Sequence, residues 1–428
     1  MKAIKRFIAL GLALLLLLPC FVGCSSKGPK MLELGDSEIS LNLFYFYLSR
    51  MKGTYCAING ISENDDSHWD SIMDSSGKTY NEYYTEFVLN EVKNLLVAVH
   101  FFEELDLELP DSEVDAIDAE IERMIEEEAN GSKSQFNKML ANYGANTAVL
   151  REAYIIEKKV EYLKNHLYGA NGERIGADMY NEYYQKNYAR FKHILFETYE
   201  YKFVTDQYGD PVYYKGTTGM SIAYKETAFT NGTDKNGDTI FLTEENGKIS
   251  YDTENGKKRV ETDENGEKVT IPLSGEALDR KIAEVKAMHG ALAAGSYAVF
   301  DTKMAEHNEE WDLEESYPNG YYVTKTTETS WNAIRDKVFT MKVGEIAEVE
   351  TEFGIHIIMR YELEDLGYNN DLNKDFFYST VTGQYLFLPS LKQYLLSEKV
   401  KPELEKITIK EKIYQKADMK SVKPNFYY

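Results

Sequence analysis

The sequence predicts an α+β protein. We expect a mostly helical region over residues 36–190, followed by an antiparallel-sheet region over residues 191–361 with a large, hairpin-rich insertion at 198–277. Apolar residues recur at helical spacing through the first region, and at Phe191 the pattern changes to that of a strand. Within the insertion, Asn-Gly recurs four times at intervals of 10, 9 and 10 residues, which is typical of short β-hairpins.

The helices of the first region are marked by apolar stripes and by capping residues. Val114, Ile117, Ile121 and Ile125 fall on one face of a helix, and Ser112 with Asp115 forms a capping-box pattern before that stripe. A further helix is expected to begin after Asn146-Thr147 and to end at Gly169. The length of 428 residues suits two or three domains.

The insertion and the C-terminal segment complete the predicted layout. Stretches of β-forming residues such as 239–242 and 268–271 flank the Asn-Gly pairs, but few apolar residues are available to bury. The insertion is therefore expected to be a meander of small hairpins or a partly ordered segment. Residues 362–428 are expected to pack back on the helical region.

The N-terminus has the features of an export signal. Lys2, Lys5 and Arg6 precede an apolar run, and Val22-Gly23-Cys24 supplies small residues before a polar stretch. We expect residues 1–23 to be a signal peptide and residues 24–35 a lipidated tether, because Gly23-Cys24 resembles the bacterial lipobox in which the cysteine receives the lipid. An ordinary secretory signal and a short membrane anchor are the alternatives, although the apolar run is short for a membrane span.

Charge and cysteine content restrict the partners. The formal net charge is −23, and removal of the three basic residues of the signal would make it −26. Such an acidic chain is not expected to bind nucleic acid, whose phosphates require Lys and Arg. Basic unfolded polypeptides would be attracted to it, although solubility explains the charge equally well. After loss of Cys20 and lipidation of Cys24, only Cys56 remains, so an intramolecular disulfide is not expected.

Two histidines carry the chemistry. His193 lies in Lys-His-Ile-Leu-Phe and His356 in Gly-Ile-His-Ile-Ile, both typical of buried strands. An imidazole in such a strand must find a hydrogen-bond partner or stay neutral. Each histidine alone fits a hydrogen-bonded core residue, and it is the flanking sequence of both that favours a shared site.

The flanking sequences resemble the parvulin family of prolyl isomerases. Residues 337–346, Lys-Val-Phe-Thr-Met-Lys-Val-Gly-Glu-Ile, and 351–358, Thr-Glu-Phe-Gly-Ile-His-Ile-Ile, resemble the C-terminal half of a parvulin domain. Lys192-His193-Ile194-Leu195 resembles its first strand, and Met304-Ala305 belongs to a stretch that resembles the following helix. The order of helices before this domain, and the tail after it, resemble the chaperone lobe of bacterial foldases such as PrsA and SurA.

The resemblance implies a prolyl isomerase that needs no metal and no cofactor. Amide resonance imposes a barrier of about 18–20 kcal/mol to rotation, so a catalyst needs an apolar slot and polar groups that favour a twisted amide. In parvulins two facing histidines and a nearby Cys or Asp supply those polar groups. His193 and His356 match the histidines, and Asp312, in the stretch 309–316, is the predicted acidic residue.

The proline pocket departs from the family pattern. Tyr322 takes the place of a pocket leucine, and the two further pocket positions fall on Ser330 and Ile334. Trp331 could supply the missing apolar surface, and Phe339 is the phenylalanine that ends the family's helix. These residues are the predicted substrate contacts, and the departures leave the quality of the pocket open.

Three functions therefore remain at this point. The first is a lipid-anchored foldase on the extracytoplasmic face of a cell membrane, at a Gram-positive surface, which isomerises X-Pro bonds and holds newly exported polypeptides. The second is the same fold without catalysis, acting as a holdase or scaffold. The third, a substrate-binding lipoprotein of a transporter, would show alternating βαβ patterns, which this sequence lacks. A homodimer is left open.

Overall fold

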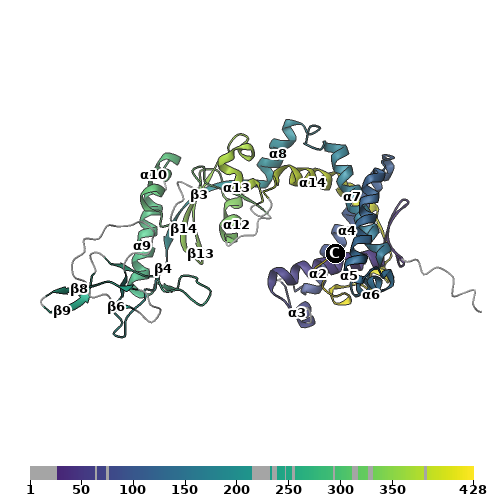
Figure 1. The fold of residues 1–428 in the computed structure, drawn as a ribbon. Helices are drawn as coiled ribbons and strands as arrows, with labels where there is room; N and C mark the ends of the chain where they lie inside the picture. Colours follow the sequence, from purple (N-terminus) through teal and green to yellow (C-terminus); the bar gives the residue numbers. More distant parts are fainter. Residues whose placement is uncertain are drawn as a thin grey trace, which may run out of the picture. The chain divides into compact units, whose positions relative to one another are not determined.

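The structure is a computed structural model with an α+β fold (Figure 1). It describes residues 27–62, 65–73, 77–214, 232–233, 239–245, 247–252, 256–292, 295–310, 317–325, 331–379 and 383–428. The predicted signal peptide and the predicted lipidation site Cys24 lie outside these residues. The chain divides into two compact units, one of residues 1–183 with 385–428, the other of residues 184–384.

The first unit is mainly helical. Its longer helices are α2 (Leu41–Asn59), α4 (Tyr80–Glu104), α5 (Asp111–Ala129), α6 (Lys133–Leu140), α7 (Thr147–Tyr168) and α14 (Phe387–Val400), with α8 (Ala177–Asn187) leading into the second unit. The cap predicted for α7 is confirmed, since Asn146 accepts hydrogen bonds from the backbone at 148 and 149, and Gly169 follows its last residue. The capping box predicted at Ser112 is wrong, because α5 begins at Asp111 after Pro110, which fixes the backbone angle ahead of the first turn.

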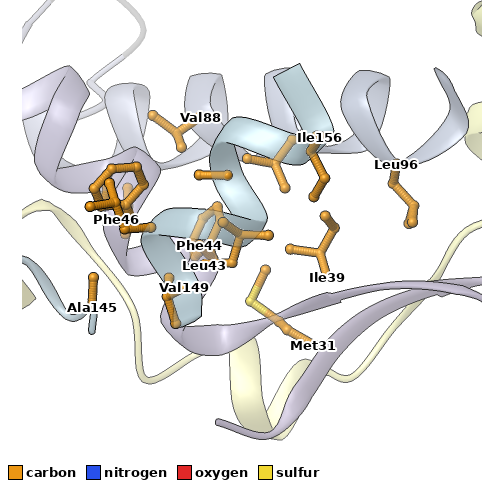
Figure 2. Close-up of a cluster of buried hydrophobic side chains, with 14 of the residues drawn as sticks. Met31, Ile39, Leu43, Phe44, Phe46, Val88, Leu96, Ala145, Val149 and Ile156 are labelled. Atoms are coloured by element: carbon orange, nitrogen blue, oxygen red, sulfur yellow. The ribbon is translucent and has the colours of Figure 1, made fainter. Parts of the chain in front are cut away.

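The core of this unit joins helices to a small sheet (Figure 2). Strand β1 (Lys30–Leu34) contributes Met31 and strand β2 (Ser37–Ser40) contributes Ile39, and both side chains are buried. Phe44 from α2, Leu96 from α4 and Val149 from α7 pack in the same cluster. The prediction that a tether extends to residue 35 is therefore wrong over residues 30–34, because this stretch pairs with β2 as a strand and buries Met31, Leu32 and Leu34 in the core.

The C-terminal segment from residue 385 closes this unit. Strand β15 (Thr408–Ile409) pairs antiparallel with β1, and Lys410 makes an ion pair with Glu33 at 2.8 Å. Farther on, the backbone N–H of Asn425 donates to the carbonyl of Ser49. The predicted segment 362–428 is thus split between the two units. Residues 385–428 pack on the helical region as predicted, whereas residues 362–384 belong to the second unit.

The second unit is built on a four-stranded antiparallel sheet. The strand order is β12 (Tyr321–Thr324), β3 (Tyr188–Glu197), β14 (Gly354–Tyr361) and β13 (Ile346–Thr351). Helices α9 (Gly275–Leu292) and α10 (Tyr297–His307) cover one face, and α12 (Asn332–Thr340) covers the other (Figure 1). Alternation along β3 sends Ile194 and Phe196 toward α9 and α10, and Phe191 toward α12.

The described part of the insertion consists of short strands. β4 (Tyr199–Tyr201) pairs with β11 (Thr270–Pro272) at its base. β8 (Leu242–Glu245) and β9 (Lys248–Tyr251) form a hairpin on either side of the predicted Asn246-Gly247 turn. Asn236, Asn246 and Asn255 lie outside the described residues. The remaining strands are β5 (Tyr213–Tyr214), β6 (Gly232–Thr233), β7 (Thr239–Ile240) and β10 (Lys257–Lys258).

Among the described residues, every helix is too short or too polar to span a membrane.

Candidate functional site

The two histidines meet on the α12 face of the sheet. β3 and β14 run antiparallel, with His193 opposite Ile358 and His356 opposite Leu195. The histidines are therefore diagonal neighbours two positions apart, a spacing across which aromatic side chains reach one another. Nδ1 of His193 lies 2.7 Å from Nδ1 of His356, and the rings are nearly parallel, with an interplanar angle of 19°. Residues 163 positions apart in sequence are brought together by strand register alone.

The bond between the rings constrains their protons. One Nδ1 must carry the hydrogen and the other must accept it. Burial, and secondarily the proximity of His193, lowers the pKa of His356 to about 3, so this ring is neutral at pH 7. Nε2 of His356 is within 2.8 Å of the Thr351 hydroxyl, which can donate or accept as the tautomer requires.

An acidic side chain completes the group. Oε2 of Glu310 lies 2.7 Å from Nε2 of His193, although the two groups are not aligned as a hydrogen bond. The contact therefore places a carboxylate beside the His193 ring without a hydrogen bond between them. The predicted acid, Asp312, lies outside the described residues. Glu310 is two positions earlier in the same acidic stretch. The family pattern has a Cys or Asp beside the histidines, so it indicates the aspartate and not this glutamate.

Glu310 is carried to the site by the segment that follows α10. The side chain of Asn308 accepts a hydrogen bond from the backbone N–H of Leu195, and the N–H of Glu309 donates to the Leu195 carbonyl. The carboxylate of Glu309 then accepts from the N–H of Glu197. Residues 308–310 are thus fastened along the C-terminal half of β3, beside His193.

Aromatic rings surround the histidines. Trp331 stands immediately before α12, with its ring centroid 5.0 Å from that of His193 and 6.1 Å from that of His356. Tyr321 lies 4.6 Å from Trp331 and 5.3 Å from His193, again between ring centroids. A hollow of about 480 Å³ opens beside this group and is lined by Leu195, Glu197, Tyr199, Tyr201, Lys268, Glu309, Glu310, Trp331, Phe353 and His356.

Other predicted substrate contacts lie elsewhere. Tyr322 is wrong as a pocket residue, because strand alternation turns it to the opposite side from Tyr321. Its hydroxyl donates to Glu364 at 2.6 Å, and its ring packs against Phe377. Tyr321, one position earlier, is the residue that reaches His193, and sequence spacing alone could not separate the two neighbours.

The two substrate contacts predicted within α12, Ile334 and Phe339, pack in the core and do not line the hollow. Ile334 is wrong as a lining residue, since it is fully buried with Val338 and Ile358 in the core between α12 and the sheet. Phe339 packs at the edge of the same core, with the ammonium of Lys325 above its ring, and does not line the hollow. Ser330 lies outside the described residues. Trp331 lines the hollow, and so does Phe353, which was not among the predicted contacts.

Comparison with known proteins gives similarity to solved structures alone. No protein-family model matches the chain, and no curated protein matches it. The similar structures include PrsA from Bacillus subtilis, at 14% identity, 82% coverage of this chain, 91% of that chain and a TM-score of 0.20. They also include peptidylprolyl isomerase (PrsA) from Bacillus cereus, at 12% identity, 82% and 91% coverage and a TM-score of 0.24. Foldase protein PrsA from Streptococcus pneumoniae gives 9% identity, 91% and 97% coverage and a TM-score of 0.20.

The three solved structures named above are PrsA proteins, foldases of the kind whose order of helices this sequence resembles.

Proposed function

We propose that the chain is a peptidyl-prolyl cis-trans isomerase of the foldase kind, with His193 and His356 as the polar floor of its site. The observation that carries this proposal is the 2.7 Å contact between the two Nδ1 atoms, beside a hollow walled by Trp331 and Phe353. Isomerisation breaks no covalent bond, so a site without nucleophile or metal suffices. The aromatic walls suit a pyrrolidine ring, and His356, which lines the hollow, can exchange hydrogen bonds with the amide as it twists while His193 supports it from behind.

The chemistry of the twisted amide explains why a neutral His356 ring suits the floor. Rotation about the C–N bond ends the resonance and returns a lone pair to the proline nitrogen, which can then accept a hydrogen bond. A neutral ring that is already hydrogen-bonded on both sides can redistribute its protons without a net transfer. A thousandfold acceleration requires about 4 kcal/mol of preferential stabilisation of the twisted state. Exclusion of water and one or two hydrogen bonds in a buried site are sufficient for that amount.

We further propose that the first unit holds unfolded, newly exported polypeptides. Ile58, Ile72 and Phe87 are exposed by 74%, 61% and 40%, and they come from neighbouring parts of α2, α4 and the connection between them. The aromatic cluster of Tyr55 and Tyr84 links these elements. Exposed apolar side chains gathered in one region favour contact with apolar client segments. In this proposal Cys24 anchors the chain by lipid to the extracytoplasmic face of a membrane.

A protease-coupled assay on a proline peptide tests the isomerase proposal. We expect the whole chain to accelerate cis-to-trans exchange, and His193→Ala and His356→Ala to lower kcat/KM by about tenfold or more. His289→Ala is the matched control, because His289 belongs to the same unit but contacts Glu348 on the surface, away from the hollow. Absence of acceleration by the unaltered chain, with aggregation of a client still suppressed, would favour the holdase without catalysis.

A further inference from the structure

The hollow beside the histidines continues along the base of the insertion. A second hollow of about 560 Å³ is lined by Tyr199, Tyr201, Gly266, Glu267, Lys268, Thr270, Glu352 and Phe353. It shares Tyr199, Tyr201, Lys268 and Phe353 with the first. The two hollows therefore adjoin along these four residues, and together we call them the insertion groove. A groove longer than a single proline can hold the residues on either side of it.

The insertion supplies one wall of this groove through a fixed piece of sheet. β4 pairs with β11 over three residue pairs, and the N–H of Leu273 donates to the carbonyl of Thr198. The rings of Tyr199 and Tyr201 pack edge to face at 5.7 Å. The Tyr199 hydroxyl donates to Glu197 at the end of β3, at 3.0 Å. This wall is thus bonded directly to the strand that carries His193.

The charge lining the insertion groove is strongly negative. Five carboxylates line the two hollows, Glu197, Glu267, Glu309, Glu310 and Glu352, against the single ammonium of Lys268. Glu309 is neutralised by Lys281 at 2.6 Å, and Glu310 faces His193. Glu267 and Glu352 make no ion pair with any cation in the described part of the chain. Their negative charge therefore remains available to a ligand.

Two further observations agree with this charge imbalance. Burial raises the pKa of Glu197 against the opposing hydrogen bond from Tyr199, and the negative charge of Glu309 adds to the rise. The ammonium of Lys268 lies over the ring of Tyr201 at 5.4 Å. Tyr201 thus already has one cation on its aromatic face, which is the interaction that a lysine or arginine of a ligand could make.

We propose that the insertion groove binds the residues next to the proline and selects peptides with lysine or arginine in those positions. This inference rests on the proposed isomerase function, because it assigns specificity to the same site. The occupant is the part of the substrate chain on either side of the proline. The second hollow adjoins the hollow beside the histidines, and its negative charge is complementary to a basic segment.

The test compares three peptides with the same central Ala-Pro bond, flanked on both sides by Lys, by Glu or by Gln. Exchange between cis and trans is followed by NMR with the whole chain as catalyst. At low salt we expect kcat/KM for the Lys peptide to exceed that for the Glu peptide by about tenfold. The ratio of the two kcat/KM values should fall toward one at about 1 M salt, because exposed charges are screened.

Adjacent residues of opposite charge provide matched variants. Glu267→Gln combined with Glu352→Gln should reduce the Lys-to-Glu ratio to about threefold or less, whereas Lys268→Gln should increase it. The Lys-to-Glu ratio is compared within each variant, so a general change in activity cancels from it. Glu276→Gln removes one negative charge from the same unit at the exposed start of α9, outside the groove, and should leave the ratio unchanged.

The outcomes separate the two proposals. If the Gln peptide is isomerised but the Lys and Glu peptides react equally fast, the specificity inference is overturned and the isomerase function stands. If no peptide is accelerated, the isomerase function itself fails. A preference for lysine that the Glu267, Glu352 and Lys268 substitutions do not move would also overturn the inference, because the selectivity would then arise outside the groove.

Discussion

At the scale of single residues, His356 links the site to the stability of the second unit. In the unfolded chain an imidazole protonates near pH 6.5, whereas burial lowers the pKa of folded His356 to about 3. Between these values the unfolded chain binds more protons, so the free energy of unfolding falls as the pH falls. The contribution is fully present above pH 6.5 and reaches a few kcal/mol, since each pKa unit corresponds to about 1.4 kcal/mol.

This linkage predicts a measurable difference between two histidine variants. In urea unfolding from pH 7 to pH 4, His356→Gln should show a smaller loss of stability than the unaltered chain. His307→Gln, at the exposed end of α10 in the same unit, should keep the full loss. Equal pH dependence in all three proteins would mean that His356 does not remain neutral in the fold.

Tyr321 and Tyr322 provide a second comparison at this scale. Tyr321 faces His193 and Trp331, whereas the hydroxyl of Tyr322 is bonded to Glu364 on the other side of β12. We expect Tyr321→Ala to lower kcat/KM by about tenfold. Tyr322→Phe should leave kcat/KM within about twofold and lower the free energy of unfolding by about 1–2 kcal/mol, because the buried hydrogen bond to a carboxylate is lost. Activity per folded molecule and unfolding midpoints distinguish the two effects.

At the scale of elements, the register between β3 and β14 determines whether the histidines meet. Gly354 begins β14 with φ of 140°, and a Cβ added there would lie 2.2 Å from the carbonyl oxygen of Phe196 in β3. Only glycine allows this approach and this backbone angle. A shift of one residue in the pairing would turn His356 to the α9 face.

Gly354→Ala should therefore affect stability and activity together. We expect a loss of about 2–4 kcal/mol in the free energy of unfolding, with reduced kcat/KM in the molecules that remain folded. Gly290→Ala is the control, because Gly290 is exposed in α9 and an added Cβ would meet no atom within 4 Å. It should be neutral, or stabilising by up to about 1 kcal/mol. If both substitutions behave alike, the close strand approach does not determine the site.

At the scale of the whole molecule, the chain leaves the first unit and returns to it. The ring of Tyr183 packs on Phe387 at 5.4 Å and on Tyr394 at 5.1 Å, so the two ends of the excursion lie side by side within that unit. Replacement of residues 184–384 by a short Gly-Ser linker should therefore leave a folded first unit. Its core draws on both the N-terminal and the C-terminal segments.

The shortened chain separates holding from isomerisation. It should suppress aggregation of an unfolded client while showing no acceleration of proline exchange. Circular dichroism and a cooperative thermal transition provide the check that it folds. If the shortened chain folds but does not suppress aggregation, the proposed role of the first unit is wrong, and client binding belongs to the residues that were removed.

Local pattern in the sequence was sufficient for much of the fold. Helical stripes predicted the helices of the first unit, and Asn146 and Gly169 marked the ends of α7 because capping acts within a few residues. The parvulin-like motifs singled out His193, His356 and Trp331, which the structure brings together.

Residue patterns were thus enough to predict the class of fold, the helical and sheet regions, and the pair of histidines. The folded arrangement was needed to find that Glu310 faces His193, that Tyr321 rather than Tyr322 reaches the site, and that Ile334 belongs to the core. It also decided that the base of the insertion forms a wall of the groove. The physical reason is that periodicity and capping act over a few residues, whereas these contacts depend on strand register and on loops that join residues about a hundred positions apart.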